Sequence, residues 1–244
     1  IQETPSDSPE VTVPPRSLTV VGTGDILIHN TLWTQAQAEG GASGMDFSPQ
    51  LAGVKARVKA ADFAICHQET PLAAEGGPYG SYPVFVTPPR IVDAIKKAGY
   101  DACSTVSNHT LDAGFDGVKR TLDELDAVGV GHSGTARTRA ESEQIAMYSV
   151  KEVTLAHLAY TYGFNGYQRP AGKKWCCNVI DPQRIVADAQ SARDQGAQIV
   201  IVSLHAGDEN VAGPNAQQQE VVAAISQSGQ DDLVRGTHKQ EALQ

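Results

Sequence analysis

The chain contains the stretch Ala102-Cys-Ser-Thr-Val-Ser-Asn-His109, which continues with Thr-Leu-Asp-Ala-Gly114. It joins an apolar, strand-like run to a short cluster of side chains that can bind metal. The same arrangement occurs four more times, in residues 18–25, 63–69, 199–205 and 233–238. In α/β sheets, ligands bind beyond the carboxyl ends of the strands. The five runs therefore predict that strand ends converge on one site, where Asp, Glu, Asn and His side chains hold divalent metal ions.

Between these runs, the spacing of apolar residues predicts helices. Val118, Leu122 and Leu125, for example, fall on one helical face. Strands are predicted at 18–22, 62–66, 101–106, 144–150, 153–159 and 199–204 and from 232 onward, and helices at 49–61, 89–98, 114–128, 181–195 and 217–228. The β-α alternation implies parallel strands covered by helices, and a hairpin turned at Lys151-Glu152 implies a second, mixed or antiparallel portion of sheet.

The bulk composition excludes some classes of function. The 244 residues carry a formal net charge of −9, which argues against binding to nucleic acid or to an anionic membrane surface. A small anionic substrate held locally by metal is compatible with that charge. The hydrophobic content of 41% is ordinary for a globular protein, and no apolar run approaches the length needed to span a bilayer.

The first sixteen residues differ in composition from the rest. Residues 1–16 are rich in Pro, Ser and acidic side chains, which predicts a disordered linker ahead of one domain at 17–244. A tether of a cell-surface lipoprotein is one interpretation of this linker, and a cloning remnant is another. Because the chain begins at Ile1 and not at Met, an upstream segment is expected to have been removed.

The four cysteines leave the redox compartment open. Cys66 and Cys103 lie in apolar runs, which favours two unpaired core thiols; pairing remains open if their strands are neighbours. Cys176-Cys177 is a vicinal pair without the C-x-x-C spacing of zinc or thioredoxin-like sites.

Two carboxylates follow the first two runs. Asp25 comes after Gly22-Thr-Gly24, whose glycines permit a tight turn that aims the carboxylate outward. The alternative for Asp25 is a cap on the next helix. Glu69 precedes Thr70-Pro71 and is therefore extended or in a turn. We expect Glu69 to bridge two cations, and the alternative is a surface Glu.

The most specific dipeptide is Asn108-His109. Asn offers an oxygen to a hard cation, and His offers a nitrogen to a transition metal or a proton to a leaving group. The alternative is an Asx-turn with a satisfied His. His205 and His238 both end apolar runs, where a purely structural His is unusual.

The remaining histidines divide into two pairs. His29 and His67 lie near the first two clusters and are candidates for contact with substrate or metal. His157 lies within a strand-like run and is expected to be structural. His132 lies in a Gly-rich stretch and is expected at the surface, in a turn.

These clusters, in this order, resemble the CapA family of bacterial capsule-synthesis proteins, also called the poly-γ-glutamate capsule domain. That family is similar to the calcineurin-like metallophosphoesterases. The resemblance runs from about Leu18 to the C-terminus. It rests on Gly24-Asp25, the looser His67-Gln68-Glu69, Phe85-Val-Thr-Pro-Pro89, Ala98-Gly-Tyr-Asp101, Ser107-Asn108-His109 through Asp112 and Gly114, and Ser203-Leu-His205-Ala-Gly207-Asp-Glu209.

The resemblance implies a four-layer α/β/β/α sandwich of the metallophosphoesterase type. It also implies an extracellular, membrane-tethered member of the capsule or poly-γ-glutamate machinery with a metal-dependent, hydrolase-like site. Mn, Zn or Fe in such a site lowers the pKa of a bound water. The implied metal ligands are Asp25, Glu69, Asn108, His205 and His238, with Asp25 also catalytic, His109 as the general acid, and His29, His67 and Glu209 as substrate contacts.

The implied partners are an anionic polymer or phosphoester substrate and membrane-bound polymer synthase subunits, without nucleic acid. Two alternatives stay open. The chain is a secreted metal-dependent phosphoesterase, or it is a non-catalytic accessory protein that binds a polyanion or a synthase subunit.

The last motif departs from the family, which shows Gly-x-His-x-His. Here the chain reads Gly236-Thr-His238-Lys-Gln240, so that Gln240 replaces a His that is a metal ligand in the phosphoesterase analogy. A neutral amide is a weaker ligand for a transition metal than imidazole. One metal position is therefore expected to be weak or absent. Family members also continue past Gln244, which leaves open whether the last elements of the fold are present.

Overall fold

Apolar strands form the first sheet of the computed structural model, which describes residues 17–229 and 232–237. The sheet contains β1 (Val20–Ile26), β2 (Phe63–Gln68), β3 (Ala102–Ser104) and β4 (Gly131–Ser133), in the order β1-β2-β3-β4. All three pairings are parallel. A parallel sheet is what strands alternating with helices predict.

The second sheet is mixed. It contains β5 (Ala146–Val150), β6 (Val153–Thr161), β7 (Ile199–His205) and β8 (Leu233–Thr237), in the order β5-β6-β7-β8. β5 and β6 are antiparallel, and the other pairings are parallel. Lys151 and Glu152 join β5 to β6 with φ angles of 48° and 63°, the left-handed conformation of a two-residue hairpin turn. The predicted hairpin is confirmed.

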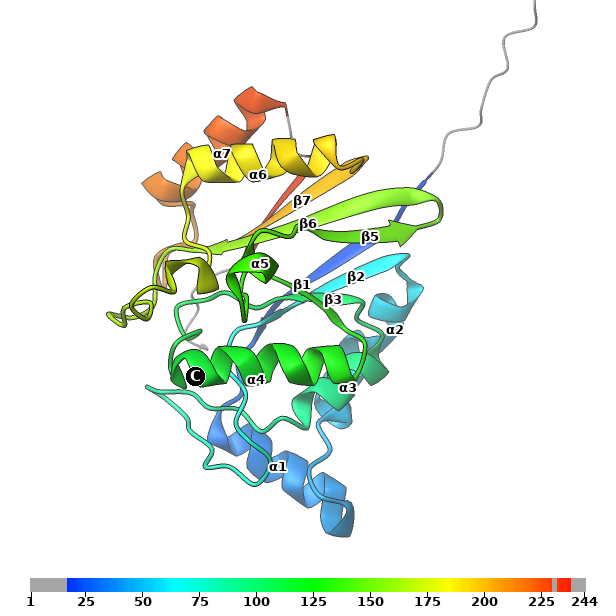
Figure 1. Cartoon of the computed structure of the whole chain (residues 1–244). Coiled ribbons are helices and arrows are strands. Elements are labelled where there is room, and N and C mark those ends of the chain that lie inside the picture. Colours follow the sequence, from blue (N-terminus) through cyan, green and yellow to red (C-terminus); the bar gives the residue numbers. More distant parts are fainter. Residues whose placement is uncertain (1–16, 230–231, 238–244) are drawn as a thin grey trace, which may run out of the picture.

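Helices cover the outer faces of both sheets (Figure 1). The longer ones are α1 (Asn30–Gly40), α2 (Ala52–Ala60), α3 (Ile91–Ala98) and α4 (Gly114–Ala127) on the side of the first sheet, and α6 (Pro182–Asp194) and α7 (Ala216–Ser228) on the side of the second. A one-turn helix, α5 (Arg139–Ser142), lies between β4 and β5 in the chain. The described residues also form short 3₁₀ helices: η1 (Gly41–Ser43), η2 (Ser48–Leu51) and η3 (Lys174–Cys176). The predicted four-layer α/β/β/α fold class is confirmed for the described residues.

Side chains alternate along each strand, so that one face of a sheet packs between the two sheets and the other packs against the covering helices. Ile65 and Ile201 belong to the core between the sheets, whereas Val200 and Val202 pack outward with helix residues such as Ile185. By the same alternation, His67 shares a face with Ile65, and His205 shares one with Ile201. Both histidines therefore point into the space between the sheets, at the carboxyl ends of their strands.

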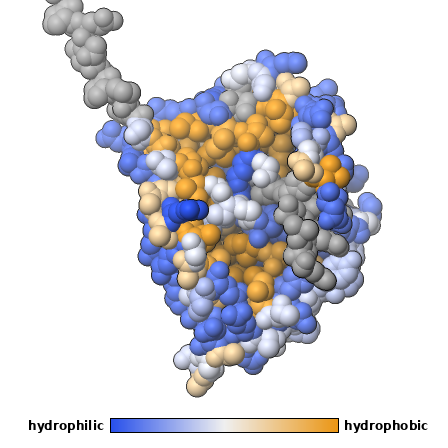
Figure 2. Space-filling model, turned by 180° about the vertical axis from the view of Figure 1, so that it is seen from behind, coloured by the Kyte–Doolittle hydropathy of each residue, from blue (hydrophilic) through white to orange (hydrophobic). Residues whose placement is uncertain are grey.

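β1 and β8, each at one edge of its sheet, are less buried than the inner strands. Every residue of β2 is buried, but most residues of β1 are exposed or half-buried. Leu233, at the start of β8, has 43% of its surface exposed. The reverse face of the molecule accordingly shows apolar surface bordered by hydrophilic side chains (Figure 2).

Several elements differ from the sequence prediction. α1 was not predicted, because only Ala36 of its eleven residues is buried and its apolar spacing is weak. β4 was not predicted because it is three residues long. His132 lies in β4 and is half-buried, so its placement in a surface turn was wrong. β1 reaches Ile26, with a register shift between Gly22 and Asp25, so that Asp25 lies inside the strand and not after it.

Cys66 and Cys103 form a disulfide. They are direct partners in the parallel register of β2 and β3, which brings their side chains together. The interpretation of both residues as unpaired core thiols was therefore wrong. Cys176 and Cys177 are buried free thiols. His157 is fully buried in β6, as predicted for a structural residue.

Some predictions concern residues whose structure is not described. The expected linker at 1–16, the predicted metal ligand His238 and position Gln240 all lie outside the described residues. Among the helices that the structure does describe, none combines the length and the apolar character needed to cross a membrane.

Candidate metal centre

Three side chains from three strands converge at the carboxyl ends of the sheets. Asp25 on β1 and His67 on β2 are partners in the parallel register, and His205 is the last residue of β7 in the facing sheet. One ligand atom from each lies within 4.8 Å of the other two. Asp25 Oδ1 lies 3.8 Å from His67 Nε2 and 3.9 Å from His205 Nδ1. A carboxylate and two imidazoles around one point form a donor set for a divalent transition metal.

Hydrogen bonds set the tautomer of His67. Its Nδ1 lies 2.6 Å from Ser104 Oγ, and the Ser104 hydroxyl donates to the Cys66 carbonyl at 3.4 Å. The hydroxyl therefore accepts from Nδ1–H, which leaves Nε2 unprotonated and facing Asp25. Burial, with the neighbouring His205 as a second cause, holds the pKa of His67 well below its ordinary 6.5. The neutral imidazole is the form that binds metal.

Asn108 sets the tautomer of His205. His205 Nε2 lies 2.9 Å from Asn108 Oδ1, an atom that only accepts, so Nε2 carries the proton and Nδ1 faces Asp25. Asn108 Nδ2 in turn donates to Asn165 Oδ1 at 3.2 Å, which orients the amide. The His205 ring also stacks on Tyr162, with centroids 6.1 Å apart. Partners of this kind orient the ligands of a metal.

Several polar atoms of the cluster are buried and have no hydrogen-bond partner among the described residues. They are Asp25 Oδ1, His67 Nε2, Glu69 Oε2 and Asp112 Oδ1. Buried polar atoms nearly always find partners, and leaving one unpaired costs about 1–3 kcal/mol. A cation held between Asp25 and His67 would satisfy both of their unpaired atoms. The residues present therefore fit a divalent metal.

The charged forms of Asp25 and Glu69 are unfavourable in the metal-free cluster. Burial raises the pKa of Asp25 to about 7, partly offset by the positive charge of Arg235. Burial also raises the pKa of Glu69 well above its ordinary range, and the charges of Asp25 and Asp112 add to the effect. Glu69 Oε1 lies 3.9 Å from His205 Nε2. A divalent cation would lower both pKa values, because it favours the charged form of each carboxylate.

His109 lies next to this cluster and is held from two sides. Its backbone N–H donates to Ser107 Oγ at 2.9 Å, and the Ser107 hydroxyl donates to the Glu69 carbonyl at 2.6 Å. Asp112 Oδ2 accepts from His109 Nδ1 at 2.7 Å and from the backbone N–H of Phe85 at 2.7 Å. A carboxylate on Nδ1 orients the imidazole and leaves Nε2 for contact with a reacting group. This is the arrangement that a general acid requires.

His29 and Glu209, both predicted as substrate contacts, lie farther from the group formed by Asp25, His67 and His205. His29 packs against the Phe85 ring at 5.0 Å, and the same ring contacts His109 at 4.8 Å. Glu209 follows β7 and lines a separate cavity of about 300 Å³ together with Tyr162. Neither His29 nor Glu209 belongs to the group of potential metal ligands among the described residues.

Arg235 on β8 was not singled out by the sequence. Its Nη1 donates to Ser203 Oγ at 3.3 Å, and its buried Nη2 has no hydrogen-bond partner in the described part of the chain. The side chain passes over Gly22 of β1, where an added Cβ would lie 2.6 Å from Arg235 Nε. Burial lowers the pKa of Arg235 to about 10, although Asp25 acts in the opposite sense. The guanidinium is therefore a fixed positive charge near Asp25.

The structure brings together most of the residues that the sequence singled out. Asp25, Glu69, Asn108 and His205 contact one another or a common neighbour, with His109 beside them. Asn108, predicted as a ligand, makes hydrogen bonds to His205 and Asn165. His67, predicted as a substrate contact, lies in the potential metal group. The roles of all these residues stay predictions.

The similarity to known proteins agrees with the fold. The family model described as bacterial capsule synthesis protein PGA_cap matches residues 19–240. The chain belongs to this family, which confirms the resemblance inferred from the motifs.

Two curated relatives carry names of the same kind. The chain is 31% identical over 151 residues to the PGA biosynthesis protein CapA of Bacillus subtilis (strain 168), covering 59% of this chain and 38% of that protein. It is 24% identical over 146 residues to the capsule biosynthesis protein CapA of Bacillus anthracis, covering 59% of this chain and 36% of that protein. The matched region thus spans well under half the length of these relatives.

Proposed function

We propose that this capsule-synthesis family member is a metal-dependent hydrolase. The observation that carries the proposal is the group formed by Asp25, His67 and His205, in which two buried, unpaired ligand atoms face each other at 3.8 Å. We infer that these three residues hold one divalent ion, with Mn, Zn or Fe as candidates by donor type. Such an ion would supply a water of lowered pKa and offset negative charge on a phosphoryl or acyl oxygen.

The surrounding residues have distinct tasks in this proposal. Ser104 and Asn108 hold the two imidazoles in the tautomers that leave a nitrogen facing Asp25. Glu69 adds a second buried carboxylate, which attracts a cation. His109, oriented by Asp112, donates a proton to the leaving group. Tyr162 stacks on His205 and helps to exclude water from that side.

The names of the relatives suggest the substrate class. They are assigned to PGA or capsule biosynthesis, so we infer an anionic polymer or a phosphoester as the substrate of this chain. The Cys66–Cys103 disulfide supports a location outside the cytoplasm, because buried structural disulfides persist in oxidising compartments. Attachment to the membrane and contact with polymer synthase subunits remain part of the proposal.

The test combines metal content with turnover. The purified full chain is loaded with Mn, Zn or Fe, its bound metal is measured by mass spectrometry, and hydrolysis of bis-(p-nitrophenyl) phosphate and of a glutamate polymer is followed. We expect bound metal and turnover of at least one substrate. His109→Ala should keep its metal and lose about 10²–10⁴-fold in turnover, the typical contribution of a general acid.

His132→Ala is the matched control, since His132 is half-buried on β4 and pairs with Asp126, away from the metal group. It should keep both metal and turnover. Bound metal without turnover of either substrate would overturn the hydrolase proposal in favour of a non-catalytic binding protein.

A further inference from the structure

A cavity of about 470 Å³ lies on the outer face of the second sheet. Tyr160 of β6 lines it and packs in the core between this sheet and its helices. The next residue, Thr161, pairs in register with His205. Because successive strand residues point to opposite faces, the cavity and the metal group lie on opposite sides of the same strand end.

The lining of this cavity is rich in positive charge, although the whole chain is acidic. Four cations line it, against the two carboxylates of Glu143 and Asp181. A third carboxylate, Asp188, pairs with one of the four cations, Arg184. The cations come from three separate segments: Arg139 from α5, Arg169 and Lys174 from the loop after β6, and Arg184 from α6. Asp181 accepts from the backbone N–H groups of Gln183 and Arg184, and so serves as the cap of α6.

The wall formed by the loop after β6 is held in place. Arg169 Nη1 donates to the carbonyls of Lys174 and Cys177, at 2.6 and 3.1 Å. The Cys176 carbonyl accepts from the backbone N–H of Ala136 at 2.8 Å. Trp175, which also lines the cavity, packs edge-on against Phe115. The site is therefore preformed, and ligand binding need not order the loop.

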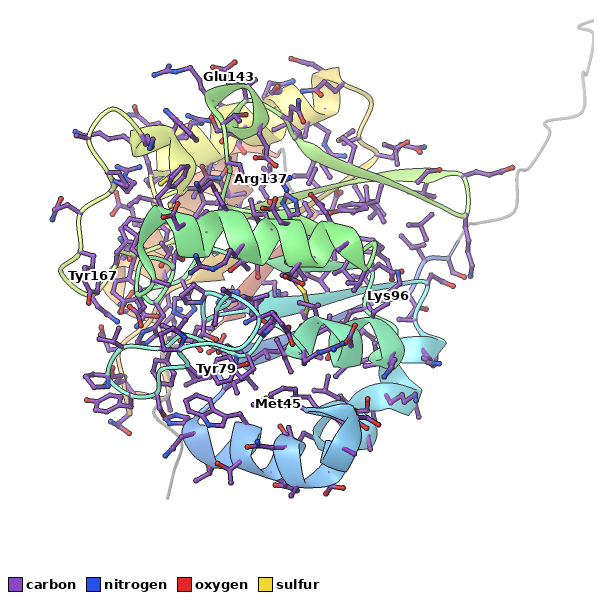
Figure 3. All side chains as sticks on the ribbon, turned by 60° about the horizontal axis from the view of Figure 1, so that its bottom comes forward. Met45, Tyr79, Lys96, Arg137, Glu143 and Tyr167 are labelled. Carbon is purple, nitrogen blue, oxygen red and sulfur yellow. A yellow bond between two sulfur atoms is a disulfide. The ribbon has the colours of Figure 1, made fainter. Side chains whose placement is uncertain are left out.

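A second cavity of about 350 Å³ adjoins the first, and both are lined by Ser142, Tyr160 and Trp175. In the second cavity, Arg137 already pairs with its own carboxylates. Arg184, which lines both cavities, pairs with Asp188. Among the described residues that line the two cavities, the cations without an ion pair are Arg139, Arg169 and Lys174, and all three lie in the first part of a longer groove. Figure 3 shows Arg137 and Glu143 near the short α5 helix. Cations spread along a groove match a ligand with repeated negative charges better than a single small anion.

We infer that this cavity is a binding site for a linear oligoanion, which Arg139, Arg169 and Lys174 hold through successive carboxylates or phosphates. Guanidinium groups bind both kinds of anion in a two-pronged manner. Arg184 is pre-oriented by Asp188 at 2.7 Å and lines the same cavity. The binding does not depend on the metal group.

The experiment is calorimetric titration of the full chain, treated with EDTA, with a glutamate oligomer and separately with tripolyphosphate. We expect at least one probe to bind, and the tighter one identifies the charged group that the site prefers. The double variant Arg139→Gln/Lys174→Gln should bind about tenfold more weakly, which corresponds to about 1.4 kcal/mol. Both side chains are exposed, so the variant should fold.

The matched control removes two cations elsewhere. Lys55→Gln/Arg57→Gln changes two exposed residues of α2 and should leave the affinity unchanged at constant salt. Binding of neither probe, unchanged affinity in the cavity variant, or an equal loss in the α2 variant would each overturn the proposal. Because EDTA is present throughout, failure of the hydrolase proposal would leave this result intact.

Discussion

Arg137 and the strand-end site are two concentrations of charge that differ in how the charge is balanced. Arg137 Nη1 lies 2.8 Å from Asp123 Oδ1 and 2.7 Å from Asp126 Oδ2, and its Nε donates to Glu141 at 3.0 Å. The Glu141 hydrogen bonds raise the pKa of Arg137 above its ordinary value, and those to Asp123 and Asp126 add to the effect. The charge of Arg137 is therefore balanced by carboxylates within its own cluster.

The strand-end cluster lacks such a balance. Asp25, Glu69 and Asp112 bring three carboxyl groups close together, and each of the three has a buried oxygen without a partner among the described residues. Among the described residues, Arg235 lowers the pKa of Asp25 by its positive charge, and burial still raises that pKa to about 7. An arrangement this unfavourable in isolation is typical of a functional site. The difference between the two clusters is what a structural role for Arg137 and the proposed metal-binding role for the strand-end cluster predict.

The largest expected effect is loss of metal from the strand-end cluster. His205→Ala removes one of three ligands, and the protein purified in Mn or Zn should retain no metal after dialysis. Metal content by mass spectrometry checks this. His132→Ala should retain the wild-type amount. Full metal occupancy in His205→Ala would show that the strand-end cluster is not the metal site.

The second effect concerns the balanced cluster. Arg137→Met leaves three carboxylates without their cation, and we expect the free energy of unfolding to fall by about 1–3 kcal/mol. Urea denaturation of the metal-free protein measures the change. Metal content should be unaffected. A stability loss together with metal loss would mean that the two clusters are coupled, and the contrast between them would fail.

The third effect is a pH dependence of the metal-free protein. Asp25 has a raised folded pKa of about 7 against an ordinary 3.8, and that of Glu69 is also raised. Both hold a proton more tightly when folded, so stability falls as the pH rises from about 4 through their folded pKa values. His67 and His157 have lowered pKa values and act in the opposite sense below pH 6.5, where the unfolded chain binds more protons.

A net loss of stability is therefore expected from pH 6.5 upward, because the two histidines oppose the loss below that pH. Thermal melts of EDTA-treated protein between pH 6 and 8 measure it. Glu69→Gln should flatten the slope, because one of the two titrating carboxyls is gone. A saturating divalent ion should also flatten it. A slope that is unchanged in Glu69→Gln would assign the effect to other groups.

The smallest effect concerns Arg235. Arg235→Leu removes a positive charge near the metal group, and we expect tighter metal binding by about threefold to tenfold, from the loss of repulsion across a partly screened distance. The measurement is calorimetry at pH 8, where proton competition at Asp25 is small. Weaker binding in the variant would mean that Arg235 supports the position of Asp25 more than it repels the cation.

The sequence predicted the fold well where apolar periodicity was strong. β7 and α4 were found within one residue of their bounds, because their apolar spacing is clear. The three-residue β4 was missed, since Gly131-His-Ser133 carries no apolar alternation. The disulfide could not be predicted, because the pairing of Cys66 with Cys103 depends on the register between two strands.

The site was predicted in part for a similar reason. Asp25 and His205 stand out as polar endings of apolar runs. The sequence indicates the place of His67 in the metal group less strongly. His67 lies two residues after Ile65 and four after Phe63, and therefore on the same face of the strand, between the sheets. Arg235 directly precedes the motif Gly236-Thr-His238, but nothing in that motif singles out Arg235 itself. Its contact with the site follows from the packing of β8 against β1.

The contact of Arg235 with Gly22 has a consequence for how the sequence can vary. A methyl group at position 22 would lie 2.6 Å from Nε and 2.7 Å from Cδ of Arg235, so even alanine requires the arginine to move. The two positions, more than two hundred residues apart in the chain, are thus expected to change as a pair. Relatives with a side chain at position 22 should carry a shorter residue at position 235, and Gly22→Ala should be better tolerated together with Arg235→Leu than alone.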